Sequence, residues 1–300
     1  MIAIHPESSS AFDAGVVPSG SPVHDGGSSP RILGETMDTS RLQSLFGLEG
    51  KRAVVTGGSR GIGAMIAEGL LDAGADVIIS ARKESQVAEA VERLSAKGNI
   101  EGIPADLSTD EGLDHLAAEV GQRWDRLDIL CNNAGASWGE PLESFSPGGW
   151  DKVMNVNVRG VFFLSQKLLP LLRTAGSADD PARIINTGSV NGLTPPGMDT
   201  FSYSSSKAAV HMLTRHLGKE LASDHITVNA IAPGPFDSNM MAFALNDPNS
   251  RAAIADGVPM GRIGLPDDMA GVAIYLASAA GAYVTGAVIP VGGGLSTITE

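Results

Sequence analysis

The stretch Thr56-Gly57-Gly58-Ser59-Arg60-Gly61-Ile62-Gly63 decides the fold of this chain. An apolar, β-branched run at 52–56 leads into it, and the helical pattern "AMIAEGLLDAG" follows. Glycine lets the backbone turn sharply and lets another group approach it closely, and the free N–H groups that begin a helix attract anions. Glycines alone would fit any tight turn, but between a strand and a helix they are typical of the first βαβ unit of a diphosphate-binding domain.

Further strands and helices alternate on both sides of this turn. Apolar runs separated by helical segments predict a parallel sheet covered on both faces, because each crossover connection carries a helix. We therefore expect an α/β fold, a single Rossmann-type doubly wound domain with a seven-stranded parallel sheet flanked by helices, whose ligand site lies at the carboxyl ends of the strands. The expected strands lie in residues 52–57, 76–81, 100–107, 127–135, 182–189, 226–234 and 287–294. The expected helices are 63–73, 85–97, 112–123, 150–175, 203–223 and 266–278.

The amino-terminal part of the chain differs from the rest. Residues 1–44 are rich in Ser, Gly and Pro and show no apolar periodicity, so we expect a flexible tail there. Residues 45–300 are expected to form the catalytic domain.

Composition narrows the range of partners. The formal net charge of −13 argues against a nucleic-acid surface and against docking on anionic lipid. No apolar run is long enough for a membrane helix, and the single cysteine, Cys131, allows no intrachain disulfide. We expect a cytoplasmic protein. The histidines are scattered, His211 and His216 are five residues apart and share no helix face, and no metal site is expected.

The residues after the second strand predict which dinucleotide binds. An acidic residue about 20 positions beyond the glycine turn would bind a ribose 2′-hydroxyl, but Arg82 stands there, and Arg60 lies within the turn itself. Two guanidinium groups suit a 2′-phosphate, which favours NADP(H) as cofactor. The alternative is that both arginines are solvated surface charges.

Four residues form a candidate catalytic cluster. Tyr203 and Lys207 are four residues apart in a helical stretch, so both side chains lie on one face. A neighbouring ammonium and an oxidised nicotinamide would lower the pKa of the tyrosine and let it exchange a proton near neutrality. Ser189 ends the fifth strand, where its hydroxyl would hold a carbonyl oxygen, and Asn157 lies on the expected long helix. Each residue alone would fit a structural role; their order behind a glycine-rich turn favours catalysis.

In these motifs the chain resembles the short-chain dehydrogenase/reductase family over residues 45–295. The matching motifs are Thr56-Gly57-x3-Gly61-x-Gly63, Asp106-Leu107, Asn132-Asn133-Ala134-Gly135, Asn157, Ser189, Tyr203-x3-Lys207 and Pro233-Gly234. One departure is that 13 residues separate Ser189 from Tyr203, where the family usually has 12. We expect one additional loop residue and an altered pocket rim.

The resemblance implies a role for each matching position. Asn157 would anchor a water molecule linking Lys207 to solvent, and Lys207 would also bind the nicotinamide ribose. Asp106 and Leu107 would contact the adenine, and Asn132 to Gly135 would support the central strand. The implied cofactor-binding residues are Gly57, Ser59, Arg60, Gly61, Ile62, Gly63, Arg82, Asp106, Leu107, Asn133, Ala134, Gly135, Tyr203, Lys207, Pro233, Gly234 and Ser238. The implied catalytic residues are Asn157, Ser189, Tyr203 and Lys207.

The stretches "NNAGASWGEPLESF", "INTGSVNG" and "VPMGRIGLPDDMA" further resemble the 3-ketoacyl reductases associated with rhamnolipid synthesis. This resemblance implies an NADPH-dependent oxidoreductase that reduces a ketone, a 3-oxoacyl thioester, to a secondary alcohol, working as a homotetramer. Two alternatives stay open: a dehydrogenase of another secondary alcohol, such as a sugar, polyol or steroid, and a non-catalytic cofactor-sensing protein on the same fold. Trp138 would line the substrate pocket or pack in the core, and Met240, Met241 and Leu245 would give an apolar lid or an ordinary packed helix.

Overall fold

The computed structural model describes residues 39–238, 241 and 246–297. Seven parallel strands form one sheet in the order β3-β2-β1-β4-β5-β6-β7, which confirms the expected doubly wound fold. All seven expected strands are present, most of them ending earlier than expected because the chain turns at the carboxyl edge. The strands are β1 (Arg52–Thr56), β2 (Asp76–Ala81), β3 (Ile100–Pro104), β4 (Ile129–Asn132), β5 (Ala182–Thr187), β6 (Ile226–Pro233) and β7 (Val288–Val291).

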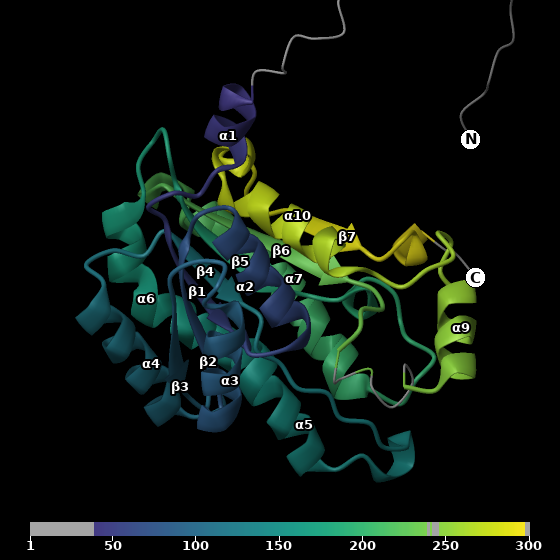
Figure 1. The fold of residues 1–300 in the computed structure, drawn as a ribbon. Coiled ribbons are helices and arrows are strands. Elements are labelled where there is room, and N and C mark those ends of the chain that lie inside the picture. The colour runs from purple at the N-terminus through teal and green to yellow at the C-terminus, as the bar shows by residue number, and fades with distance from the viewer. Residues whose placement is uncertain (1–38, 239–240, 242–245, 298–300) are drawn as a thin grey trace, which may run out of the picture. The chain divides into compact units, whose positions relative to one another are not determined.

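Helices cover both faces of this sheet (Figure 1). The crossovers contain α2 (Gly61–Asp72), α3 (Glu84–Leu94), α4 (Asp110–Arg123), α5 (Pro147–Met154), α6 (Val161–Ala175), α7 (Phe201–Glu220) and α10 (Pro266–Ala277). The expected helix 150–175 is instead two helices, α5 and α6, joined by the π-helical turn η2 (Asn155–Gly160). Two α-helices of the described residues were not expected: α9 (Pro248–Asp256), and α1 (Ser40–Phe46), which includes the last residues of the expected tail. Residues 1–38 of that tail lie outside the described residues, so the domain boundary stays a prediction.

The core lies in two layers, one on each side of the sheet. Consecutive residues of a strand point to opposite faces, and in β1 both Val54 and Val55 are fully buried. Val55 packs in the cluster that holds Leu70 of α2, and Val54 packs in the cluster that holds Leu116 of α4 and Leu168 of α6. Burial on both faces explains why the strands are continuous apolar runs without alternation.

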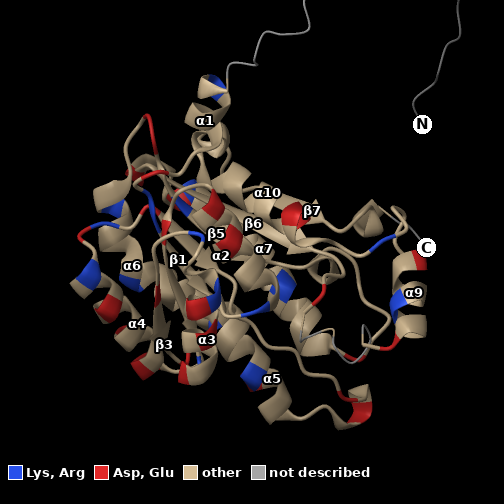
Figure 2. Cartoon of the chain, in the orientation of Figure 1, with Lys and Arg blue, Asp and Glu red and all other residues tan. Residues whose placement is uncertain are grey.

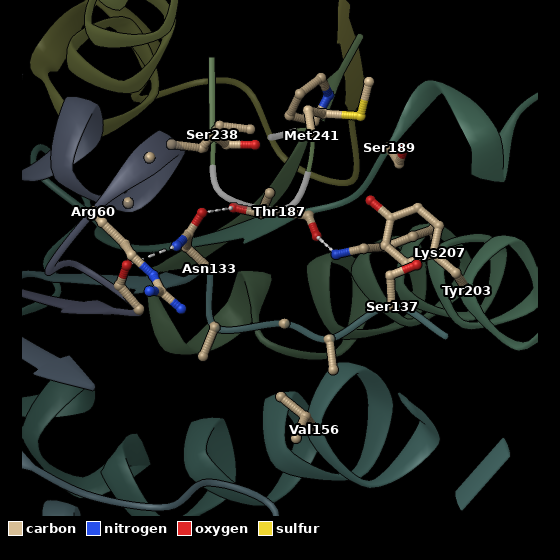
Figure 3. Close-up of a pocket in the computed structure, with 18 of the residues that line it drawn as sticks. Arg60, Asn133, Ser137, Val156, Thr187, Ser189, Tyr203, Lys207, Ser238 and Met241 are labelled. Atoms are coloured by element: carbon tan, nitrogen blue, oxygen red, sulfur yellow. Dashed lines mark hydrogen bonds between the residues drawn. The ribbon is translucent and has the colours of Figure 1, made fainter. Parts of the chain in front are cut away.

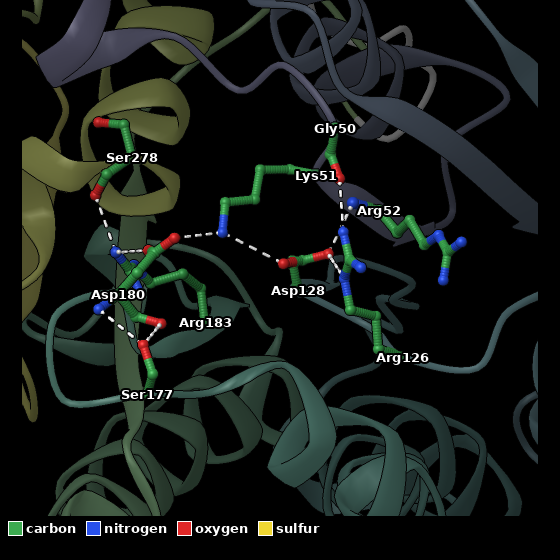
Figure 4. A network of polar contacts seen from close by, with 9 residues as sticks. All are labelled: Gly50, Lys51, Arg52, Arg126, Asp128, Ser177, Asp180, Arg183 and Ser278. Atoms are coloured by element: carbon green, nitrogen blue, oxygen red, sulfur yellow. Dashed lines mark hydrogen bonds and ion pairs between the residues drawn. The ribbon is translucent and has the colours of Figure 1, made fainter.

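Charged residues are arranged differently on the outer surface and at the amino edge of the sheet. Acidic residues predominate on α3 and α4, whereas the charged residues of α6 are basic (Figure 2), and Lys167 of α6 pairs with Asp114 of α4. At the amino edge, opposite the carboxyl ends, Lys51 contacts both Asp128 and Asp180, and the buried Arg183 donates to Asp180 and to the Ser278 carbonyl (Figure 4). No helix among the described residues is both long and apolar enough to cross a membrane.

Candidate active site

A cavity of about 1120 Å³ lies at the carboxyl edge of the sheet, where six strands end. It spans the switch point between β1 and β4, at which the strand order reverses. In doubly wound sheets this is the position of the ligand crevice. Every residue expected to bind the cofactor lines this cavity, as do the expected catalytic residues Ser189, Tyr203 and Lys207. Asn157 does not line it.

The glycine turn forms one wall of the cavity, and its glycines are required by geometry. Gly57 and Gly61 have φ angles of +66° and +53°, the left-handed region that other residues avoid. A Cβ on Gly63 would lie only 2.2 Å from the Gly57 carbonyl oxygen. Helix α2 begins at Gly61 with no side chain capping its first N–H groups, so the turn and the helix start form a cradle that would accept a diphosphate.

Asn133 braces this turn against two strands. Its Nδ2 donates to the Thr56 carbonyl at 3.0 Å. Its Oδ1 accepts from the Thr187 hydroxyl at 3.3 Å (Figure 3). The Thr56 hydroxyl in turn accepts from the backbone N–H groups of Asn133 and Ala134, at 2.9 and 3.0 Å. The ends of β1, β4 and β5 therefore form one hydrogen-bonded unit.

Two arginines lie at the end of the cavity beside β2. Arg60 and Arg82 are exposed, line the cavity and make no ion pair in the part of the chain that is described. Asp106 sits beside Arg82. Burial alone would raise the pKa of Asp106, but hydrogen bonds from Ser108 and the charge of Arg82 lower it below its ordinary value. These residues fit an adenine ribose that carries a 2′-phosphate.

Ser238 and the end of β6 form another wall of the cavity. A Cβ on Gly61 would lie 3.1 Å from the Cβ of Ser238, so this side chain lies directly over the glycine turn. Gly234 is also closely packed, because a Cβ there would lie 2.7 Å from the Gly292 Cα. Met241 lines the cavity, whereas Met240 and Leu245 of the expected lid lie outside the described residues.

Helix α7 brings Tyr203 and Lys207 to the cavity, one turn apart and on the same face. The Lys207 Nζ donates to the Thr187 carbonyl at 2.7 Å and lies 5.6 Å from the centre of the Tyr203 ring. The Ser189 hydroxyl accepts from the Asn191 N–H at 3.1 Å, and its side chain is a hydrogen-bond partner of Tyr203. Figure 3 shows Ser189, Tyr203 and Lys207 together at one end of the cavity.

Burial shifts the pKa values of both titrating groups. It lowers the pKa of Lys207 to about 8. It also raises the pKa of Tyr203 above its ordinary value, and the hydrogen bond with Ser189 only partly opposes this. In the chain without cofactor the pKa of Tyr203 is therefore raised and not lowered, because desolvation of the phenolate outweighs the hydrogen bond with Ser189. The lowering expected beside an oxidised nicotinamide stays a prediction.

Asn157 lies behind the cavity wall, on the π-helical turn η2, and is 1% exposed. Its Oδ1 accepts from the Ala136 N–H at 2.8 Å, and its Nδ2 donates to the Ala136 carbonyl at 3.0 Å and to the Ser206 hydroxyl at 2.9 Å. These contacts tie the end of β4 to α7. A π-turn is frequent at functional sites because its extra residue re-aims a side chain. The anchoring of a water molecule by Asn157 stays a prediction.

Two residues of the site were not predicted from the sequence. Thr187 holds Lys207 through its main-chain carbonyl, and no residue type announces such a role. Lys152 of α5 lines the cavity with its Nζ 4.1 Å from the ring centre of Trp138. Trp138 itself also lines the cavity, in agreement with the first of its two expected roles.

Comparisons with known proteins agree with this geometry. A family described as enoyl-(acyl carrier protein) reductase matches residues 57–296. The chain is 54% identical over 253 residues to the rhamnolipids biosynthesis 3-oxoacyl-[acyl-carrier-protein] reductase of Pseudomonas aeruginosa, covering 84% of this chain and 99% of that one. It is 39% identical over 255 residues to a 2-dehydro-3-deoxy-D-gluconate 5-dehydrogenase of Pseudoalteromonas atlantica, covering 83% and 97%.

The solved structures include a Pseudomonas aeruginosa RhlG/NADP active-site complex, which is 53% identical to this chain with a TM-score of 0.83. The match covers 84% of this chain and 99% of that one.

Proposed function

Because the chain belongs to the short-chain dehydrogenase/reductase family, in the branch described as enoyl-(acyl carrier protein) reductase, we propose that it is an NADPH-dependent reductase that converts a 3-oxoacyl thioester to the 3-hydroxyacyl product. The observation that carries this proposal is the convergence of the Ser189 hydroxyl, the Tyr203 phenol and the Lys207 ammonium on one end of the cavity. The words enoyl-(acyl carrier protein) reductase describe the matching family and do not specify the substrate of this chain. The 54% identical relative is named for reduction of the 3-oxoacyl group.

The cavity supplies a complementary group for each part of NADPH. The glycine turn and the start of α2 would hold the diphosphate, Arg60 and Arg82 the 2′-phosphate, and Lys207 the nicotinamide ribose. Asp106 and Leu107 would contact the adenine, while Pro233, Gly234 and Ser238 would flank the nicotinamide carboxamide. When bound, NADPH supplies the hydride that adds to the carbonyl carbon.

The chain's own residues then handle the carbonyl oxygen. Ser189 donates a hydrogen bond to this oxygen and fixes its position. Tyr203 gives its phenolic proton to the same oxygen as negative charge develops there, so the C=O group becomes CH–OH. Because the pKa of Lys207 is about 8, this side chain is charged in most molecules at neutral pH. The charge stabilises the phenolate that Tyr203 becomes when it has given up its proton. The phenolate regains its proton from solvent.

The apolar side of the cavity supports a fatty acyl substrate. Val190, Met198 and Met241 line it, and Trp138 with Leu295 adds further apolar surface. Such a surface suits an alkyl chain better than a polyol, which would need many polar partners. The second candidate is a sugar-acid dehydrogenase, favoured by the 39% identical relative named for that activity.

A panel of substrates separates these candidates. We expect turnover of 3-oxoacyl thioesters with NADPH, followed by the absorbance of the reduced nicotinamide, and little oxidation of sugar acids or polyols with NADP⁺. Good turnover of a polyol with none of the thioesters would reverse the order. Cofactor binding without turnover of any ketone would favour a cofactor-sensing protein.

Removal of Arg60 and Arg82 is predicted to abolish the preference for NADPH. Both side chains are exposed and screened, so we expect Arg60→Ala and Arg82→Ala each to weaken NADPH binding about tenfold, and the double variant more, with NADH affinity nearly unchanged. Fluorescence titration with both cofactors measures this, with Arg41→Ala on α1 as the control. Equal affinity of the wild type for NADH and NADPH would contradict the assignment.

We also propose a cytoplasmic homotetramer built on the faces of α5, α6 and α7. Exposed Trp150, Phe162 and Met212 on these helices support an interface, because large apolar side chains are costly to leave in water. The only cysteine is buried and unpaired, in keeping with a reducing compartment. Light scattering after size exclusion gives the mass of the assembly, and a monomer at working concentration would overturn the proposal.

A further inference from the structure

His211 lies one turn of α7 beyond Lys207 and outside the lining of the cavity. It is 2% exposed, and its Nε2 accepts a hydrogen bond from the backbone N–H of Ser189 at 3.4 Å. Its contact is therefore with the main chain of a residue assigned to the carbonyl oxygen. The scattered positions of the histidines in the sequence give no indication of this.

The imidazole is enclosed by glycines on both sides of Ser189. A Cβ on Gly188 would lie 2.1 Å from the His211 Nε2, and a Cβ on Gly192 would lie 2.9 Å from its Cε1. At position 188 only glycine leaves room for the ring, whereas a Cβ on Gly192 would meet the backbone of α7, the Lys207 carbonyl carbon at 2.7 Å, before it met the ring. The loop after β5 is therefore folded closely around the imidazole and against α7.

Three successive turns of α7 each hold one group of the segment 187–189. Tyr203 is a hydrogen-bond partner of the Ser189 side chain, Lys207 donates to the Thr187 carbonyl, and His211 accepts from the Ser189 N–H. The three residues are spaced four apart, so they form one row on the helix. His211 therefore continues the row of Tyr203 and Lys207 on this face of α7, and its contact is with the backbone of Ser189.

The ring is neutral under working conditions, as an acceptor must be. Burial lowers the pKa of His211 to about 4, and the charges of Lys207 and Arg215 on the same helix act in the same direction, while contact with the Gly192 backbone opposes the shift only in part. At neutral pH the Nε2 lone pair is therefore available to the Ser189 N–H.

We propose that His211 is a positioning residue, whose neutral imidazole fixes the Ser189 main chain so that the Ser189 hydroxyl stays aimed at the substrate carbonyl oxygen. The inference rests on the proposed function of Ser189. Since His211 touches neither the cavity nor the cofactor side, it acts on kcat and leaves the affinity for NADPH unchanged.

Three variants test this role. His211→Leu keeps the volume but removes the acceptor, and we expect kcat for the best ketone of the panel to fall about tenfold with an unchanged KM for NADPH. His211→Gln places an amide oxygen near the position of Nε2 and should recover most of the lost kcat. His216→Gln, at an exposed position of the same helix, is the matched control and should behave as the wild type.

Amide hydrogen exchange at Ser189 gives a readout that does not depend on turnover. The amide should be protected in the wild type and in His211→Gln, and should exchange on the order of tenfold faster in His211→Leu. Unprotected exchange in the wild type, wild-type kcat in His211→Leu, or equal losses in the Leu and Gln variants would overturn the inference. Protected exchange in a wild type that reduces no ketone would instead overturn the proposed function.

Discussion

Replacement of Tyr203 by phenylalanine should lower kcat for ketone reduction by about two to four orders of magnitude, while NADPH binds almost as tightly as before. The ring and its packing remain, and only the hydroxyl that gives the proton is lost. Ser189 still holds the carbonyl oxygen, so a residual rate from positioning remains. Stopped-flow or steady-state kinetics with NADPH fluorescence titration measures both quantities.

Tyr283→Phe is the matched control for this variant. Tyr283 is fully exposed, and removal of its hydroxyl should leave kcat and cofactor affinity unchanged. Turnover in Tyr203→Phe equal to that of the wild type would show that another group supplies the proton. If Tyr203→Phe lost both NADPH binding and turnover, the phenol would be shown to serve cofactor binding.

Replacement of Lys207 by methionine should abolish most of the activity and at the same time stabilise the fold at neutral pH. Burial lowers the pKa of Lys207 from 10.5 to about 8, which corresponds to a cost of about 3 kcal/mol for keeping the buried ammonium below pH 8. Loss of the hydrogen bond to the Thr187 carbonyl offsets part of the gain. We therefore expect a net stabilisation below about 3 kcal/mol.

The pH dependence identifies the cause of this stabilisation. Between the folded pKa of about 8 and the ordinary value of 10.5, the unfolded chain binds more protons at Lys207 than the folded chain. The free energy of unfolding of the wild type therefore rises with pH over this interval, and the advantage of Lys207→Met shrinks. Denaturant unfolding at pH 7, 9 and 10 measures the difference in the free energy of unfolding between Lys207→Met and the wild type. Lys219→Met, at an exposed position of α7, is the control. A pH-independent difference would contradict a depressed pKa.

The sheet could be predicted from the sequence because its physical requirements appear in the residues themselves. Strands buried on both faces must be continuous apolar runs, and the turn at Gly57–Gly63 must be glycine where φ is positive or a Cβ would clash. The expected cofactor residues therefore lie together at the carboxyl edge. The homotetramer and the individual roles of the site residues stay predictions.

Features set by main-chain geometry could not be predicted. The π-turn at Asn155–Gly160 interrupts the expected helix, yet apolar periodicity continues across it. Lys207 is held by a carbonyl and Ser189 by its N–H, groups that every residue has, so neither the role of Thr187 nor that of His211 appears in the residue types. The pKa of Tyr203 depends on its burial, which the spacing to Lys207 does not specify.

The most direct test of the central claim follows hydrogen from the cofactor to the substrate. The wild type is incubated with a 3-oxoacyl thioester and NADPH that carries deuterium at the transferable position of the nicotinamide, one stereoisomer at a time, and the product is examined by mass spectrometry and NMR. We predict a 3-hydroxyacyl thioester with one deuterium on the new CH–OH carbon, from one of the two isomers only. Alcohol without deuterium from either isomer, or no alcohol at all, would contradict the account.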